Sequence, residues 1–564
     1  MSSLPTLTTT WPSATTQVVT PPAPILNEAT RHLCAGAYVD HEYCTTVLRD
    51  VYFDRSRRLA PSYGFDLLSV LVHARRAWLL DLGQHGAVTL IALASLVMDP
   101  FSFAAAVAIL ASWYILRRAA RLLSAYVRFL LGRTHPEEPD RIRSQATILG
   151  LAFVGIWGAL LLVLFTTEGA ARLELVGAIP LLDRVALLVA LLATIAIVFA
   201  CARQRMISKF TSGAKSPNRL SRRLAEIDEE QTRPVTVYSG FRPFVGSGLD
   251  LMTWSFAQRL LPSTEDAELE EQEGMVKDEG ASFTTPEIIG YLKKRIADLA
   301  FDPIPERKLP NLTVRDHIFV TGSHARTSNV PEYPEYADFV RVMSNTTKRT
   351  RHYLACQVPS WDGEVVTTVY VHVSLQGRTL YLEFSTLVLP PTSGKFRVVD
   401  QVGGTGIRAY SRCLAKTVWK LPETLVLCHL SLGTAARCIT YLARGRLWRK
   451  FESRGIDIGA KLSVRELGAE LVTDRIARFQ MNTGINYFQY RDVIKHAKVI
   501  ERRLLAAVLD FLVAKGIDSR EYKQQVLTIL NSGILHMGDG DVEVTGVVGA
   551  QGTFHSGQTP GATE

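Results

Sequence analysis

The sequence has few cysteines and none of the short motifs that mark common catalytic sites. Its 564 residues include seven cysteines, an odd number, and no C-x-x-C pair. We therefore expect reduced, mostly buried thiols rather than a disulfide framework or a zinc site. The phosphate-binding patterns G-x-x-x-x-G-K-S and G-x-G-x-x-G are also absent. These absences predict no bound metal and no cofactor, and they leave any catalytic residues unidentified.

The first residues do not predict a cleavable signal peptide either. Residues 1–29 are rich in Thr, Pro and Ser, without a basic start and an apolar core, which predicts a disordered tail. The net charge of +9 does not indicate nucleic-acid binding. Much of the excess lies beside apolar runs, where anionic lipid explains it, and no basic stripe with interleaved aromatics occurs.

Long apolar runs, by contrast, fill the region 77–202. A hydrocarbon core of about 30 Å needs roughly 20 such residues in a helix. One helix through the first two runs would place Asp99 and Pro100 in mid-membrane, where both are costly, so we interpret these runs as two spans joined by a turn. The candidate spans are residues 77–98, 101–116, 146–165 and 185–202.

Charge placement favours an even number of spans. Segment 117–145 holds seven Arg against three acidic residues, and segment 203–223 holds seven Lys or Arg and no acidic residue. Arg75 and Arg76 precede the first span. The positive-inside rule places all three segments in the cytoplasm, which predicts four spans in two hairpins with both termini inside. Three spans remain the alternative.

Composition divides the rest of the chain into segments. Residues 263–282 carry eight Asp or Glu, which repel one another, and this predicts a flexible loop. The predicted fold is thus an α-helical membrane bundle plus a cytoplasmic α+β domain. The predicted segments are an N-terminal cytoplasmic helical segment (30–76), a basic juxtamembrane and glycine-rich segment (203–262), an acidic flexible loop (263–282), the α+β domain (283–532) and a glycine-rich tail (533–564).

The clearest β signal is the alternation of apolar and polar residues in 365–389, which predicts a hairpin that turns at Gln376 and Gly377. The apolar stretch 425–442 contains His429 and Arg437, so we interpret it as a buried or interfacial helix rather than a fifth span. Other predicted elements are strands at 235–238, 315–321 and 396–399 and helices at 286–299 and 491–515.

A glycine-rich loop follows the 235–238 strand and is the candidate ligand site. Gly246 and Gly248 allow tight turns and close approach of the backbone. Together with Arg242 and Ser247 they would offer amides, a hydroxyl and a positive charge to a small ligand. A purely structural turn is the alternative.

Three functions fit these features. In the first, the protein is a membrane-anchored scaffold or sensor whose cytoplasmic domain binds a protein partner, a second copy or a small ligand. In the second, it is a membrane-bound enzyme with a site assembled from scattered residues: Arg242, Asp316, His317, His324 and Asp362. A transporter would need polar residues within the spans, where only Asp81, Gln84 and His85 qualify. The absence of catalytic motifs favours the first.

Four phrases of the sequence resemble a group of uncharacterised actinobacterial multi-pass membrane proteins. The resemblance implies a bacterial plasma-membrane location and carries over no activity and no site residues. The phrases are LCAGAYVD (33–40), APSYGFDLLSVL (60–71), YSGFRPFVGSG (238–248) and VPSWDGEVVTTVYVHVSLQGRTLYLEF (358–384).

Overall fold

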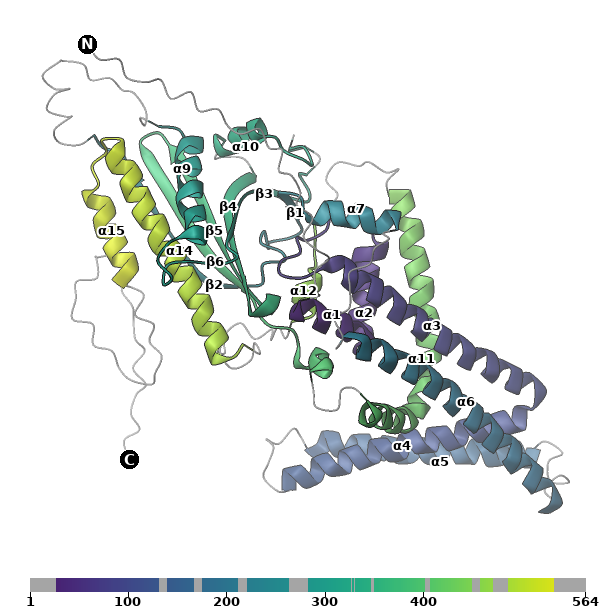
Figure 1. Ribbon diagram of the computed structural model, residues 1–564. Helices are drawn as coiled ribbons and strands as arrows, with labels where there is room; N and C mark the ends of the chain where they lie inside the picture. Colours follow the sequence, from purple (N-terminus) through teal and green to yellow (C-terminus); the bar gives the residue numbers. More distant parts are fainter. Residues whose placement is uncertain are drawn as a thin grey trace, which may run out of the picture.

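Long helices and a sheet domain make up the molecule (Figure 1). Most of the predicted tail 1–29, the acidic loop 263–282 and the tail 533–564 lie outside the described residues. The computed structural model describes residues 27–130, 139–166, 175–210, 221–262, 283–325, 327–328, 330–345, 349–400, 406–448, 457–469 and 485–531.

Four long helices form the predicted membrane region: α3 (Leu67–Met98), α4 (Pro100–Leu130), α5 (Pro139–Thr166) and α6 (Leu175–Lys209). Within the described part of the chain, three stretches are long and apolar enough to cross a membrane: Leu67–Met98, Pro100–Ser124 and Leu182–Lys209. The apolar stretch described in α5 is shorter, Thr147–Ala159. Three of the four predicted spans therefore have helices of sufficient length.

Two ion pairs join α3 and α6 at opposite ends of their apolar stretches. Asp81 pairs with Arg203 at 2.6 Å, and Asp99 pairs with Arg184 at 3.1 Å. The residues between the paired positions include no Asp, Glu, Lys or Arg on either helix. At 1.5 Å per residue the two ion pairs lie about 27 Å apart. The pairing makes α3 and α6 antiparallel, and Asp99 ends α3 where the sequence predicted a turn.

The N-terminal segment forms a small helical platform where α3 begins and α6 ends. It contains α1 (Glu28–Val39), α2 (His41–Val47) and the π-helix η1 (Leu48–Phe53). Asp40 caps α2 by accepting hydrogen bonds from the backbone N–H groups of Glu42 and Tyr43. Leu33 of α1 packs in one core with Leu71 of α3, Phe210 after α6 and Ile227 of α7 (Arg222–Gln231).

The sheet has six strands in the order β1-β3-β4-β5-β6-β2. All neighbouring strands are antiparallel except β1 and β3, which are parallel. The predicted 365–389 hairpin is confirmed as β5 and β6, with Gln376 paired to Thr379 around the turn. The strands are β1 (Val235–Tyr238), β2 (Leu249–Arg259), β3 (Thr313–Thr321), β4 (Thr350–Ser360), β5 (Val365–Gln376) and β6 (Thr379–Leu389).

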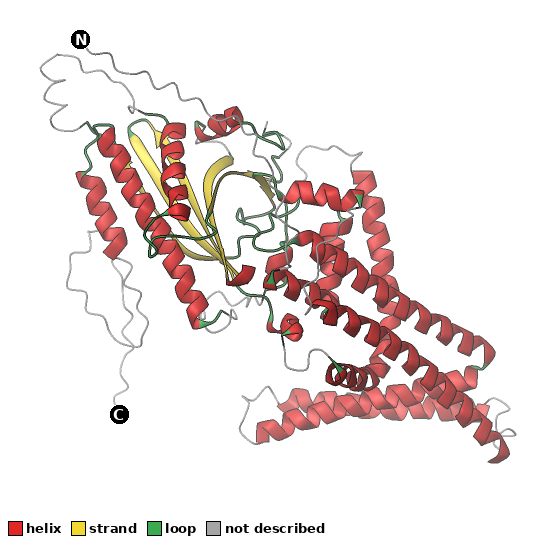
Figure 2. Cartoon of the chain, viewed as in Figure 1, coloured by secondary structure: helices red, strands yellow, loops and turns green. Residues whose placement is uncertain are grey.

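Helices cover one face of this sheet (Figure 2). Alternate apolar residues such as Val371 and Leu382 point from the strands into a core with Leu292 and Leu504 from the covering helices. The helices of this domain are α9 (Thr285–Ala297), η4 (Asp298–Phe301), α10 (Tyr336–Met343), α14 (Tyr487–Ala514) and α15 (Arg520–Asn531).

Segment 396–399, predicted as a strand, is instead part of the 3-10 helix η6 (Gly394–Val399). The paired prolines at 390–391 end β6, since proline has no N–H to donate to a ladder. Phe396 turns inward and packs at 4.9 Å between ring centres on Tyr43 of α2. The segment therefore joins the sheet domain to the helical platform rather than extending the sheet.

Helix α11 (Ile407–Trp448), with Pro422 inside it, returns along the long helices. Arg117 of α4 is 4% exposed, forms an ion pair with Glu423 at 2.9 Å and lies over the Trp419 ring. Leu421 joins the apolar cluster of α3, α4 and α6. The stretch 425–442 is helical as predicted; most of its side chains lie outside the described residues.

Candidate functional site

A cavity of about 350 Å³ lies on the sheet face opposite the helices. Three segments form its walls: residues 61–65, which lead into α3; residues 231–234, which join α7 to β1; and the strands β3, β4 and β5. Pro61, Phe65 and Val366 make part of the wall apolar. The cavity therefore adjoins both the segment before the long helices and the segment after them.

A chain of hydroxyl and amide groups forms one side of the cavity. The Tyr63 hydroxyl is hydrogen-bonded to Gln357 and to the Tyr370 hydroxyl, and Tyr370 in turn contacts the Ser247 hydroxyl at 2.8 Å. Tyr370 and Ser247 are fully buried. Tyr63 and Gln357 line the cavity itself, so a bound molecule would contact the outer end of a buried polar network.

Two neighbouring residues of β3, Asp316 and His317, line the cavity, and their side chains point to opposite faces of the sheet. His317 contacts the Thr236 hydroxyl at 2.7 Å; burial and the nearby charges of His352 and Arg315 lower its pKa to about 3. Burial alone would raise the pKa of Asp316, but His352 at 2.9 Å and Lys293 at 2.5 Å outweigh burial and lower it to about 2. At neutral pH His317 is therefore uncharged and Asp316 is ionised and paired.

Two arginines bring positive charge to the same walls. Arg233 is held by Glu332 at 2.9 Å and lies over the Tyr333 ring. Arg315 is exposed, and no hydrogen bond or ion pair of its side chain occurs among the described residues. Of the two guanidinium groups at the cavity, Arg233 is paired with an acidic residue and Arg315 has no partner among the described residues.

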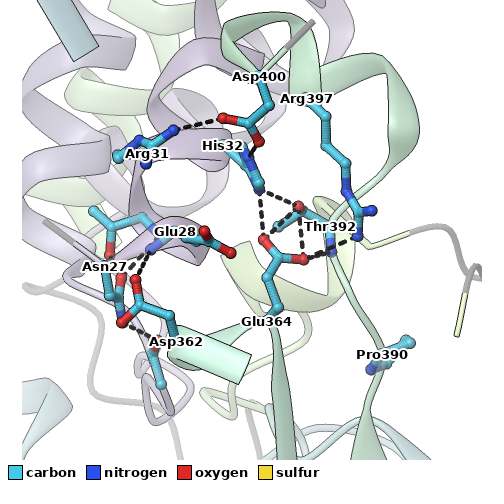
Figure 3. Close-up of polar contacts among 12 residues, drawn as sticks. Asn27, Glu28, Arg31, His32, Asp362, Glu364, Pro390, Thr392, Arg397 and Asp400 are labelled. Atoms are coloured by element: carbon cyan, nitrogen blue, oxygen red, sulfur yellow. Dashed lines mark hydrogen bonds and ion pairs between the residues drawn. The ribbon is translucent and has the colours of Figure 1, made fainter. Parts of the chain in front are cut away.

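Beside the cavity, a polar cluster joins α1 to the sheet domain (Figure 3). We call the buried His32, Glu364 and Thr392, together with the exposed Asp400, the α1 junction. His32 lies between two carboxylates: its Nδ1 donates to Glu364 at 2.6 Å and its Nε2 to Asp400. Both ring nitrogens face acceptors, so the imidazole carries both protons. Burial lowers the pKa of His32, but Glu364 and Asp400 outweigh burial and raise it.

Glu364 is the centre of this junction. It is 3% exposed and also accepts hydrogen bonds from the Thr392 N–H at 2.8 Å, the Thr392 hydroxyl and Arg397. Burial would raise its pKa, but the hydrogen bond from His32, the charges of Arg465 and His32 and the Thr392 N–H outweigh burial and lower it to about 2. Arg465 is fully buried and donates to the backbone oxygens of Glu364 and Pro390 at 2.7 and 2.8 Å. Buried charges of opposite sign therefore fix α1 to the start of β5.

The same helix also holds the cavity wall. The Asn27 side chain donates to the Gly64 carbonyl at 2.7 Å, and the Asp66 N–H donates to the Thr30 hydroxyl at 2.9 Å. Asp362 caps α1 by accepting from the Glu28 N–H at 2.8 Å. Segment 61–66, α1 and the start of β5 are therefore one connected unit.

The predicted glycine loop lies behind this wall. The amides of this loop are hydrogen-bonded to Glu466 of α12 (Val464–Leu467). Its Oε1 accepts from the Gly246 N–H at 2.8 Å and from the Gly248 N–H at 3.0 Å. Ser247 is buried against Tyr370, and the charge of the exposed Arg242 lowers the pKa of Glu466. The loop holds a carboxylate of its own chain, and its role in binding an external ligand stays a prediction.

Of the five residues proposed for an enzyme site, the structure brings two to the cavity, Asp316 and His317. Asp362 caps α1, and His324 lies in the turn after β3 beside Arg349. Arg242 lies in the glycine loop. The five residues do not form one site.

The sequence interpretation missed Tyr63, Arg315, His32 and Glu364. A single histidine in an amphipathic helix and a single glutamate before a strand carry no motif. The signal that could have revealed the contact between His32 and Glu364 is Glu364 itself. It is an acidic residue directly before the apolar run of β5, and a carboxylate buried there needs a partner.

Comparison with known families places the sheet domain. A family model for the AbeC-like domain matches residues 253–544, slightly more than half of the chain. The match begins within β2 and includes β3 to β6 and helices α9 to α15. Neither a curated protein nor a solved structure matches the chain. The actinobacterial and multi-pass parts of the resemblance noted above stay predictions. By the extent of this match, the chain belongs to the AbeC-like domain family.

Proposed function

We propose that the protein is a membrane-anchored sensor in which a small ligand in the cavity controls how the sheet domain contacts the helices that enter the membrane. One observation carries this proposal: residues 61–65 and 231–234, which flank the long helices, share the cavity with β3, β4 and β5. A ligand bound there would contact all three parts at once. Its binding energy would favour the arrangement in which residues 61–65, residues 231–234 and the sheet are in contact with one another.

The chemistry of the cavity favours binding over catalysis. A general acid or base works best with a pKa near the working pH. Asp316 and His317 instead have pKa values of about 2 and about 3. Asp316 also directs its carboxylate to Lys293 and His352 on the helix-covered face. Neither group is therefore set to exchange protons with a ligand in the cavity.

Four spans with both termini in the cytoplasm of a bacterial plasma membrane fit this arrangement. Segments 61–66 and 231–234 lie together on the sheet domain, so the chain between them leaves and returns on one side, which requires an even number of crossings. The ion pairs Asp81–Arg203 and Asp99–Arg184 bracket uncharged stretches of about the thickness of a hydrocarbon core. With α5 as the fourth span, the basic segments beside the helices face the cytoplasm.

Filling the cavity tests the sensor proposal without a known ligand. Ala355 is 5% exposed and lines the cavity; Ala257 is exposed on the same sheet face, on β2. Ala355→Phe and Ala257→Phe would be compared in the full chain in lipid nanodiscs by hydrogen exchange. We expect Ala355→Phe to change exchange in segment 61–66, in α1 and in the first turns of α3, and Ala257→Phe to leave them unchanged. A change confined to the strands around Ala355 would contradict the proposal.

A further inference from the structure

Of the charged groups that line the cavity, Arg315 differs from the others in its pairing. Asp316 is the only acidic residue among the described residues that line it, and its carboxylate is neutralised by Lys293 at 2.5 Å and His352 at 2.9 Å. Arg233 pairs with Glu332 at 2.9 Å, and Glu332 also pairs with Arg58. Arg315 keeps its positive charge without a partner in the described part of the chain. Arg315 is therefore the guanidinium that is available to a bound group at the cavity.

Other groups at the cavity are hydrogen-bonding but neutral. Tyr63 and Gln357 present a hydroxyl and an amide. His317 adds no charge, because its pKa is lowered to about 3 by burial and by the charges of His352 and Arg315. A guanidinium beside neutral donors is the arrangement that binds a carboxylate or phosphate group, with charge-assisted hydrogen bonds from the arginine.

We infer that the cavity binds a small organic anion, with its carboxylate or phosphate group on Arg315 and its body against the apolar wall. This inference rests on the proposed function, because it assigns the ligand class of the same cavity. A volume of about 350 Å³ is at the lower end of the range of small-molecule sites. Pro61, Phe65, Pro359 and Val366 supply the apolar wall, so the ligand combines one anionic group with a compact apolar or aromatic body.

The location of Arg315 separates this site from a lipid headgroup site. Arg315 lies on β3, on the sheet face covered by segment 61–65, and the helical platform of α1, α2 and η1 lies between the sheet and the apolar halves of α3 and α6 (Figure 1). The anion would therefore reach the cavity from the aqueous side of the platform.

Matched pairs of probes test the inference in the full chain in nanodiscs of zwitterionic lipid. Calorimetric titration would compare benzoate with benzamide, AMP with adenosine, and inorganic phosphate alone. We expect saturable binding of at least one anion, at least about tenfold tighter than its neutral counterpart. The carboxylate and phosphate pairs show which anionic group the site prefers.

Two arginine variants locate the binding. Arg315→Gln removes the cavity charge, while Arg351→Gln removes a charge from an exposed arginine on the same sheet face, outside the cavity. We expect Arg315→Gln to weaken anion binding at least about tenfold and Arg351→Gln to change it by less than about twofold. Unchanged thermal midpoints of both variants would show that each is folded.

Two results would overturn the inference. Benzamide or adenosine binding as tightly as its anionic counterpart, with Arg315→Gln behaving like wild type, would remove the anionic class and leave the proposed function standing. No Arg315-dependent binding of any of the three anions would remove the anion site. The proposed function fails separately, if Ala355→Phe leaves segment 61–66 and α1 unchanged.

Discussion

His32 in α1 and Glu364 before β5 are 332 residues apart in the sequence, and their side chains meet at 2.6 Å with both residues almost fully buried. The contact ties α1, which packs on α3, to the start of β5. Because burying either charge alone is costly, each residue stabilises the ionised form of the other.

Removing the imidazole should therefore destabilise the protein strongly. We expect His32→Ala to lower the free energy of unfolding by about 3–5 kcal/mol, because Glu364 stays buried without its main partner. Urea unfolding followed by near-ultraviolet circular dichroism measures the change. His324→Ala, outside the junction, should change stability by less than about 0.5 kcal/mol. Similar small effects of both variants would mean that the junction contributes little.

The junction should also make stability depend on pH. The pKa of His32 is raised in the folded protein, so its contribution is complete below its ordinary pKa of about 6.5 and is lost as pH rises through the raised value. Unfolding free energies would be measured from about pH 6 to about pH 9. We expect wild type to lose more stability over this range than His32→Gln; equal slopes would argue against a protonated His32.

Some of these features follow from local sequence and others do not. The alternation in 365–389 predicted the β5–β6 hairpin, and apolar length with basic flanks predicted α3, α4 and α6. These signals are local, since periodicity and length act within one element. The partners of His32 and of the glycine loop lie more than 200 residues away. The packing of α1 and of the α12 segment on the sheet domain brings these residues together.

The error at 396–399 has a related cause. The apolar residues Phe396 and Val399 lie beyond the prolines that follow the hairpin, and the sequence predicts a further strand there. In the structure their burial comes from α1 and α2, elements that no local pattern connects to this segment. A short apolar run is compatible with either structure, and tertiary contacts decide between them.

The glycine loop supplies a prediction about backbone conformation. Gly248 has φ +92°, and an added Cβ would lie 2.1 Å from the Val388 carbonyl oxygen. We expect Gly248→Ala to cost more than about 2 kcal/mol. Gly290, exposed in α9 with open space around it, is the matched control: Gly290→Ala should stabilise by about 0.5–1 kcal/mol. Thermal unfolding compares them, and a neutral Gly248→Ala would show that the loop tolerates a different backbone path.

Glu466 tests what the loop amides require. Burial raises the pKa of Glu466 against the two amide hydrogen bonds and the charge of Arg242. Glu466→Ala leaves the N–H groups of Gly246 and Gly248 without their acceptor, at an expected cost of about 1–3 kcal/mol. Glu466→Gln keeps a side-chain oxygen and should stay closer to wild type. If the two variants lose the same stability in urea unfolding, the carboxylate charge rather than the acceptor oxygen holds the loop.

The proposal depends above all on the long helices crossing the membrane an even number of times, so that segment 61–66, segment 231–234 and the sheet domain share one side. Reporters of membrane sidedness fused after Met98, after residue 165 and at the C-terminus test this most directly. We predict external signals at the first two positions and an internal signal at the C-terminus. An external C-terminus would separate the sheet domain from the cytoplasm and contradict the four-span sensor.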